Sequence, residues 1–208
     1  MRDIDDLLPE VLIHAPNCAD PVAVRYLREA ARQMCEKVDI WRERNSIIIS
    51  NDEESGLVAV PDAEIVRIET ASLDGVPLTP QSPEWLDENY PGWDDEVATG
   101  ATSRFVTQIK PGVLQVVPFN VGTLKVRLIL KPSRDALTFP DFLVEKYGTE
   151  LGKGAAARVL MLPTDDTGSN PQMGTLLQSE FSAFLDTLPM KVAKGQQGAR
   201  VRTRGSYF

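Results

Sequence analysis

The stretch DPVAVRYLREAARQMCEKVDIWRERNSIII, residues 20–49, decides the fold class, because its hydrophobic period changes partway along. Asp20-Pro21 is typical of a helix start, with an N-cap followed by a proline in the first turn. Apolar residues then recur every three or four positions, which predicts a helix whose charged opposite face is solvated. From Ser46 the chain becomes β-branched, so we expect a sheet to begin there. The apolar helical positions are Val24, Leu27, Ala31, Met34, Val38 and Trp41.

Short β-branched runs and tight turns continue as far as residue 131. Asp74-Gly75 is a strong reversal signal between two of these runs. In the last run, apolar residues alternate with Lys125 and Arg127, as in a strand with one buried face. The runs predict an antiparallel meander or a small sandwich, not a parallel nucleotide-binding sheet. They cover residues 47–49, 57–60, 64–73, 104–109, 113–117 and 124–130.

Two further helices are expected after the sheet region. Apolar residues at helical spacing run through residues 143–160 and again through residues 170–189. We expect these helices to form an antiparallel pair. Glycines inside a helix lower its stability, so Gly148, Gly152 and Gly154 indicate close packing of another backbone or a local bend.

These patterns together predict the α+β class. We expect a helical bundle, made of the N-terminal helix and the C-terminal antiparallel helix pair, beside the antiparallel β meander or small sandwich. The length fits a single α+β domain over residues 1–195, with helical parts at 1–45 and 139–190 and a β region at 46–131. Residues 196–208 are expected to form an extended docking tail.

A long connection, residues 79–103, separates the two groups of strands. Connections of this length are usually functional or disordered. Trp85, Tyr90 and Trp93 favour an excursion that is anchored on the sheet or touches a neighbouring subunit. The alternative is a catalytic carboxylate cluster at residues 94–96, although adjacent side chains diverge and no histidine or lysine accompanies them.

The composition argues against several classes of function. The formal net charge is -8, whereas nucleic-acid binding requires Lys and Arg clustered over a broad face, so no specific nucleic-acid binding is expected. His14 is the only histidine, which excludes a multi-histidine metal centre. The GxSxG and GxGxxG motifs are absent. We therefore expect no catalytic residues, no metal and no cofactor, and a protein that is not an enzyme.

The cysteines and the N-terminus indicate the compartment. Cys18 and Cys35 lie outside any CxxC spacing, so they are expected to be reduced core thiols. The N-terminus is acidic where a signal peptide would be basic, and no long apolar run occurs. We therefore expect no membrane association and no export by a signal peptide.

The end of the chain, QQGARVRTRGSYF at residues 196–208, is typical of a peptide that binds another protein. The last acidic residue is Asp186, and every later charge is basic. Basic residues alternate with small or β-branched ones, as in a strand that could add to another subunit's sheet edge while its arginines meet carboxylates. The alternative is a frayed basic terminus. The expected partner-binding residues are Arg200, Val201, Arg202, Arg204, Tyr207 and Phe208.

Short motifs also occur in a characteristic order along the chain. They are Leu8-Pro9-Glu10-Val11 before Pro16-Asn17-Cys18, the helix 23–31 leading to Trp41, the strand 65–68 before Asp74-Gly75, the Trp93 loop, the strand 124–126, Lys131-Pro132, the helix 143–160 with Gly154-Ala155, and Asn170-Pro171. In this order they resemble the adaptor, or head-to-tail connector, proteins of tailed bacteriophages.

The resemblance implies a structural virion protein that forms a ring, usually a dodecamer, joining the portal to the tail. The implied partners are the portal protein, docked through the C-terminal tail, neighbouring copies of the chain, and the next tail or nozzle protein. DNA would pass through the lumen. The implied location is the neck or tail of the virion, after assembly in the host cytoplasm. The alternatives are a tail terminator or neck protein of the same virion, or a small soluble enzyme that uses acidic loop residues.

Overall fold

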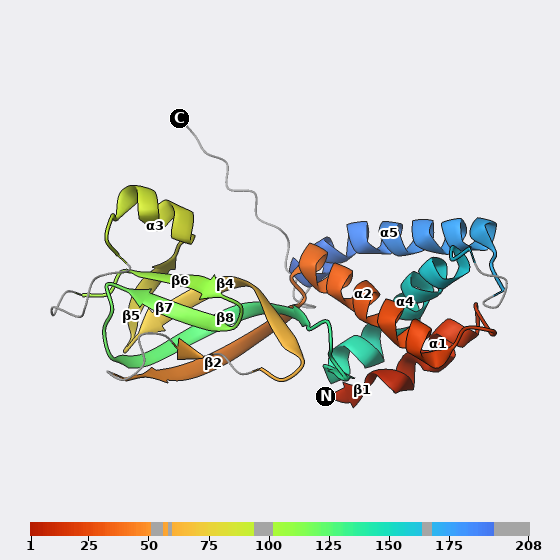
Figure 1. Cartoon of the computed structure of the whole chain (residues 1–208), viewed down its shortest axis with the longest axis horizontal. Coiled ribbons are helices and arrows are strands. Elements are labelled where there is room, and N and C mark those ends of the chain that lie inside the picture. The colour runs from red at the N-terminus through yellow and green to blue at the C-terminus, as the bar shows by residue number, and fades with distance from the viewer. Residues whose placement is uncertain (51–55, 58–59, 94–101, 164–167, 194–208) are drawn as a thin grey trace. The chain divides into compact units, whose positions relative to one another are not determined.

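The structure, a computed structural model, describes residues 1–50, 56–57, 60–93, 102–163 and 168–193. It divides into a helical unit, Met1–Ile40 with Arg134–Phe208, and a β unit, Trp41–Ser133. The α+β class is confirmed (Figure 1). The expectation of one domain over residues 1–195 stays a prediction. The tail at residues 196–208 and the acidic run at residues 94–96 lie outside the described residues.

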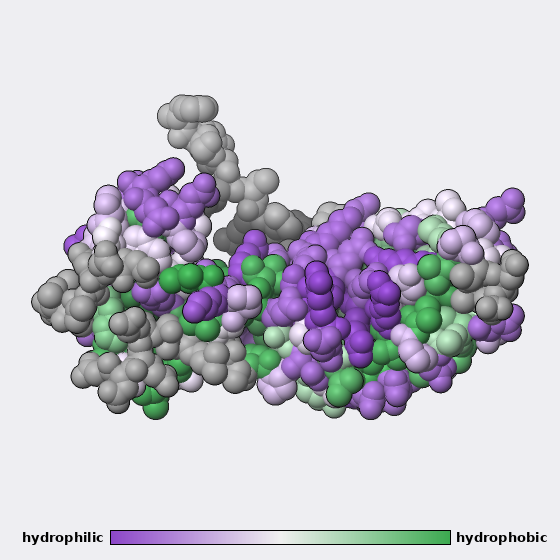
Figure 2. Space-filling view, viewed as in Figure 1, coloured by the Kyte–Doolittle hydropathy of each residue, from purple (hydrophilic) through white to green (hydrophobic). Residues whose placement is uncertain are grey.

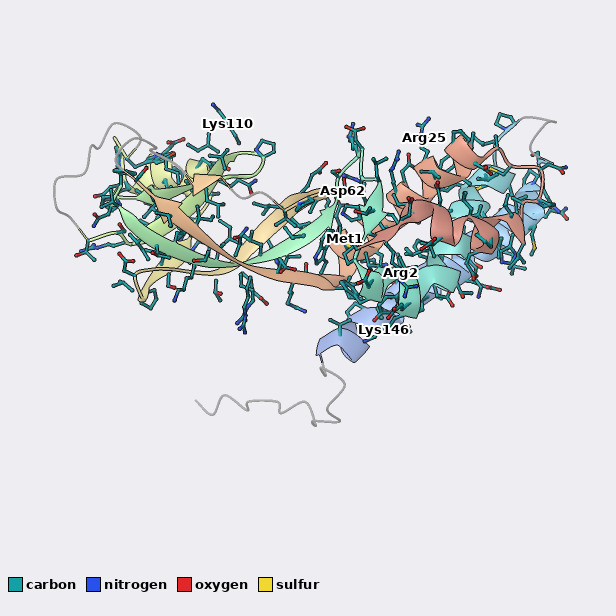
Figure 3. All side chains as sticks on the ribbon, turned by 90° about the horizontal axis from the view of Figure 1, so that it is seen from below. Met1, Arg2, Arg25, Asp62, Lys110 and Lys146 are labelled. Carbon is teal, nitrogen blue, oxygen red and sulfur yellow. The ribbon has the colours of Figure 1, made fainter. Side chains whose placement is uncertain are left out.

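Helix α4 is the centre of the helical unit, since α1, α2 and α5 all pack against it. The expected antiparallel pairing of α4 with α5 is confirmed, because Gly154 lies against Phe181 whereas the later Ala157 lies against the earlier Gly174. The N-terminus is held beside α4 by an ion pair of 2.6 Å between Arg2 and Glu145. Figure 3 labels Arg2 and, on α4, the adjacent Lys146. The elements of this unit are β1 (Arg2–Asp3), η1 (Ile4–Leu7), α1 (Leu8–Leu12), α2 (Asp20–Val38), β9 (Thr138–Phe139), α4 (Asp141–Leu160) and α5 (Pro171–Ala193).

Both ends of α2 differ from the sequence-based expectation. Ala19 is the N-cap, and Asp20 lies in the first turn. Helix α2 ends at Val38 because Asp39 adopts a left-handed conformation with φ of 54°, and the Asp39 N–H donates to the Cys35 carbonyl. The helical assignment of Trp41 and the expected sheet start at Ser46 were therefore wrong, since strand β2 begins at Trp41.

The helix α5 extends past the proline at which it was expected to end. Pro189 lies inside this helix, which continues to Ala193. A proline removes one backbone donor and crowds the preceding turn, but the helix can still continue beyond it. Four buried apolar residues hold α5 on the unit before that point: Leu177, Phe181, Leu185 and Leu188.

The glycines of α4 allow the close approach that the sequence indicated. A Cβ at Gly152 would lie 2.5 Å from the Glu10 Cβ and 2.9 Å from the Glu10 backbone. At Gly148 the nearest atom is a methyl group of Leu7, at 2.8 Å. Gly152 therefore permits direct contact between α4 and the backbone of α1, which confirms the expected packing of another backbone.

The substitution Gly152→Ala is expected to destabilise the protein. Alanine favours a helix over glycine by about 1 kcal/mol, but forcing an atom into the Glu10 backbone costs about 1–3 kcal/mol. We expect a net loss of about 1 kcal/mol in the free energy of unfolding, measured by urea denaturation. Gly148→Ala is the matched control, since the Leu7 methyl can move, and it should lose less. Equal or greater stability of Gly152→Ala would contradict this packing.

The β unit contains a seven-stranded curled sheet in the order β2-β8-β4-β5-β6-β7-β3 (Figure 1). Neighbouring strands are antiparallel as expected, apart from the parallel pair β5–β6. Strand β8 lies between β2 and β4, so the strands do not follow the sequential order of a simple meander. The strands are β2 (Trp41–Ile49), β3 (Gly56–Leu57), β4 (Ala63–Leu73), β5 (Val76–Pro80), β6 (Phe105–Lys110), β7 (Val113–Val117) and β8 (Gly122–Pro132).

Strand β8 has the alternation that its sequence predicted. Lys125 is exposed and Arg127 is half-buried, whereas the intervening Leu124, Val126 and Leu128 are buried. The reversal at Asp74-Gly75 is also confirmed, because both residues have positive φ and connect β4 to β5.

Part of the expected loop at residues 79–103 is regular structure. Strand β5 continues to Pro80, and the helix α3 covers Pro83–Asn89. Ser82 caps this helix, since its hydroxyl accepts a hydrogen bond of 3.2 Å from the Trp85 backbone N–H. The loop assignment missed the helix, although a serine followed by a proline is a common helix start.

Candidate partner-binding surfaces

The three aromatic residues expected to make loop contacts come together on the sheet of their own chain. Trp93 is buried beside Leu86, and its indole N–H donates to the Asp87 carboxylate at 2.8 Å. Trp85 and Tyr90 pack against this cluster as well as against Phe105, whose ring centroid lies 5.3 Å from that of Trp85. The aromatic side chains therefore anchor α3 on the β unit. Their contact with a neighbouring subunit stays a prediction.

The exposed face of α3 is acidic. Glu84, Asp87 and Glu88 are all exposed, and the Asp87 carboxylate already accepts the indole N–H of Trp93. Glu84 and Glu88 lie one turn apart, where like charges repel. In the part of the chain that the structure describes, neither glutamate has an ion-pair partner. Helix α3 thus presents a fixed pair of carboxylates to solvent.

A basic groove of about 500 Å³ crosses the outer face of strands β2, β8 and β4. The antiparallel register places side chains from the three strands side by side in two neighbouring rows, each with one residue from each strand. Hydroxyl groups alternate with cations along this surface, which suits carboxylate or phosphate oxygens as ligands. The rows are Ser46–Lys125–Ser72 and Arg44–Arg127–Thr70.

The positive charge of this groove is only partly balanced. Arg44 lies directly opposite Arg127, an arrangement that destabilises a sheet. Glu69 lies 3.7 Å from Arg127 and also pairs with Arg42 at 3.2 Å. Among the described residues, Arg44 and Lys125 have no carboxylate partner. The groove therefore has a net positive charge that an anionic partner would neutralise.

A second basic pocket, of about 470 Å³, lies on the helical unit. Figure 2 shows strongly hydrophilic residues gathered over α2, and Arg25 lies on the outer side of that helix in Figure 3. Arg25 pairs with Glu29 at 3.6 Å, and Arg28 donates to the Ala136 carbonyl at 2.6 Å. The sequence pattern predicted only an ordinary solvated surface for this face. The residues that line the pocket are Arg25, Arg28, Glu29, Arg32 and Arg134.

A partly buried arginine on α4 adds charge close to this pocket. Arg158 donates to Gln33 at 2.5 Å, and burial lowers the pKa of its guanidinium, an effect that the charge of Glu29 opposes. Glu29 therefore interacts with both Arg158 and Arg25. Because it is the single carboxylate among the residues that line the pocket, the site is suited to anions.

The described ranges contain neither a candidate metal site nor a candidate membrane-spanning helix. No group of three or more His, Cys, Asp or Glu side chains there could hold a metal ion. No helix in the same ranges is long and apolar enough to cross a membrane.

No protein-family model and no curated protein matches the chain.

The two cysteines are free and buried, as the sequence predicted. Burial, together with the nearby charge of Glu36, raises the pKa of the Cys35 thiol to about 12. Because the thiolate is the reactive form, Cys35 is not suited to be a nucleophile.

We expect Cys35 to resist labelling in the folded protein. In a Cys18→Ser variant, an aromatic disulfide reagent at about pH 8 should react at least about a hundredfold more slowly with native protein than with protein in urea. The difference arises because burial suppresses the thiolate and blocks access. Absorbance of the released thiol gives both rates. Equal rates for the native and the unfolded protein would show that Cys35 is accessible.

Proposed function

We propose that this chain is a structural protein of a tailed bacteriophage that forms a ring between the portal and the tail. One observation carries the proposal: the charge is segregated along the chain. All 30 acidic residues precede residue 187, whereas the segment after it contains basic residues and ends in Tyr207-Phe208. Such a segment suits an acidic groove on another protein. We propose that residues 196–208 dock on the portal protein.

The described surfaces fit a protein that acts by binding. Each unit has a basic concavity, one on α2 and one on the sheet, and α3 has an acidic face. A ring subunit needs several separate contact surfaces, for its two neighbours and for the rings above and below it. These surfaces support the proposal, together with the order of motifs that resembles the connector proteins.

The described core of the helical unit is complete before the proposed docking segment begins. Among the residues of α5 whose burial is described, Leu188 is the last buried one, and α5 itself ends at Ala193. The ion pair of 2.5 Å between Lys37 and Asp186, which joins α2 to α5, also precedes the tail. We therefore expect the fold to form without residues 196–208.

Deletion of residues 196–208 is expected to leave the protein folded and to abolish portal binding. The thermal unfolding midpoint should shift by no more than about 2 °C, because all the described core residues precede the deleted segment. Affinity for the purified portal of the same virus, measured by biolayer interferometry, should fall at least about a hundredfold, since the deletion removes charged and aromatic anchors together.

Full-length variants show whether the basic charge of the tail matters. Replacement of Arg200, Arg202 and Arg204 by glutamate should also abolish binding, whereas replacement of all three by lysine should retain part of it, because lysine keeps the charge but not the bidentate geometry. Undiminished portal affinity of the truncated protein would refute the docking role. Tail-dependent binding to a different virion ring, without portal binding, would place the chain at the terminator or neck position instead.

A further inference from the structure

The described residues on the outer face of the sheet carry positive charge that is only partly balanced. The register places Arg44 directly opposite Arg127, and Lys125 lies two residues away along β8. Of these three, only Arg127 has a carboxylate beside it among the described residues, and that carboxylate, Glu69, also binds Arg42. An anion placed in the groove would relieve this repulsion and could accept hydrogen bonds from the serine and threonine hydroxyls between the cations.

The same unit has a surface of the opposite charge. Helix α3 holds Glu84 and Glu88 exposed and one turn apart, on a helix fixed to the sheet by buried Trp93. The chain has no basic residue from position 81 to position 103. Because α3 is anchored before any partner arrives, little conformational entropy is lost when it docks.

These two surfaces do not meet within one copy. Helix α3 packs on β6, and two strands, β4 and β5, separate β6 from β8 in the sheet. Figure 1 shows α3 on the opposite side of the β unit from β2. Complementary surfaces at different places on one subunit make a head-to-tail contact between copies, and repetition of that contact gives a ring when the rotation closes.

We propose that the groove formed by Arg44, Lys125 and Arg127 of one copy binds the acidic face of α3 of a second copy. The inference rests on the proposed ring function and identifies the surfaces that join neighbouring subunits. Glu84 and Glu88 lie over the two cationic rows, and the groove hydroxyls donate to their carboxylates. The contact is ionic, so it weakens as the salt concentration rises.

A pair of charge-reversed full-length proteins tests the contact. The first variant, R44E/K125E, has an acidic groove and an acidic α3. The second variant, E84K/E88K, has a basic groove and a basic α3. All four positions are exposed, so both variants are expected to fold. Each variant alone should self-associate more weakly than the unmodified protein, because its groove and helix now repel each other.

When the two variants are mixed, the acidic groove of R44E/K125E faces the basic α3 of E84K/E88K, and the basic groove of E84K/E88K faces the acidic α3 of R44E/K125E. Both contacts are then between opposite charges. Binding between them should be at least about tenfold tighter than the self-association of either, as measured by sedimentation with one partner fluorescently labelled. Mixed binding no tighter than self-association would overturn the proposal. A second result would also overturn it: the unmodified protein binds duplex DNA, R44E/K125E does not, and mixing the two variants gives no tighter binding. The groove would then be a binding site for phosphates.

Two controls make the result unambiguous. Circular dichroism shows whether R44E/K125E folds. If it does not, the variant S46E/T70E is used in its place, because it introduces two carboxylates into the same groove at exposed positions. Portal binding is measured for each variant in its monomeric form. Because the tails of both variants are unchanged, this measurement tests the docking role separately from the groove contact. Retained portal binding without gain on mixing would overturn the groove contact alone. Gain on mixing without tail-dependent portal binding would overturn the docking role alone.

Discussion

The β unit depends on the two ladders that strand β8 forms, with β2 on one side and β4 on the other. The alternation of β8 directs Leu124, Val126 and Leu128 into the core and directs Lys125 and Arg127 outward. A shift of one residue in either ladder would bury cations and expose leucines. The register that builds the core is therefore also what concentrates positive charge on the outer face.

Charge separation connects the fold to the proposed function. The chain has a formal net charge of -8, yet the concavities of both units are basic, and the acidic side chains of α3 lie on another part of the β unit. When copies of such a protein associate, the basic groove of one copy can be neutralised by the acidic helix of another. In a ring, every subunit makes this same contact with its neighbour. Under the proposed arrangement, the sheet groove joins neighbours while residues 196–208 remain available to the portal.

The sequence predicted the parts of the fold that depend on local spacing, and missed those set by distant pairing. Helices α2, α4 and α5 follow from apolar periodicity. Trp41 fits that period, but spacing cannot reveal that Asp39 adopts a left-handed conformation and ends the helix. The groove was not foreseen because Arg44 and Arg127 are far apart in the chain and meet through strand register. Ser82-Pro83 did contain the signal for α3.

We propose that this protein works through ionic contacts with its own copies and with a portal. The most direct measurement is the mass of the complex that the full chain forms with its portal ring, determined by native mass spectrometry at increasing ammonium acetate concentration. The account predicts many copies on each portal at low salt and progressive loss of copies as charges are screened. A complex that contains at most one copy, or one whose composition does not change with salt, would contradict it.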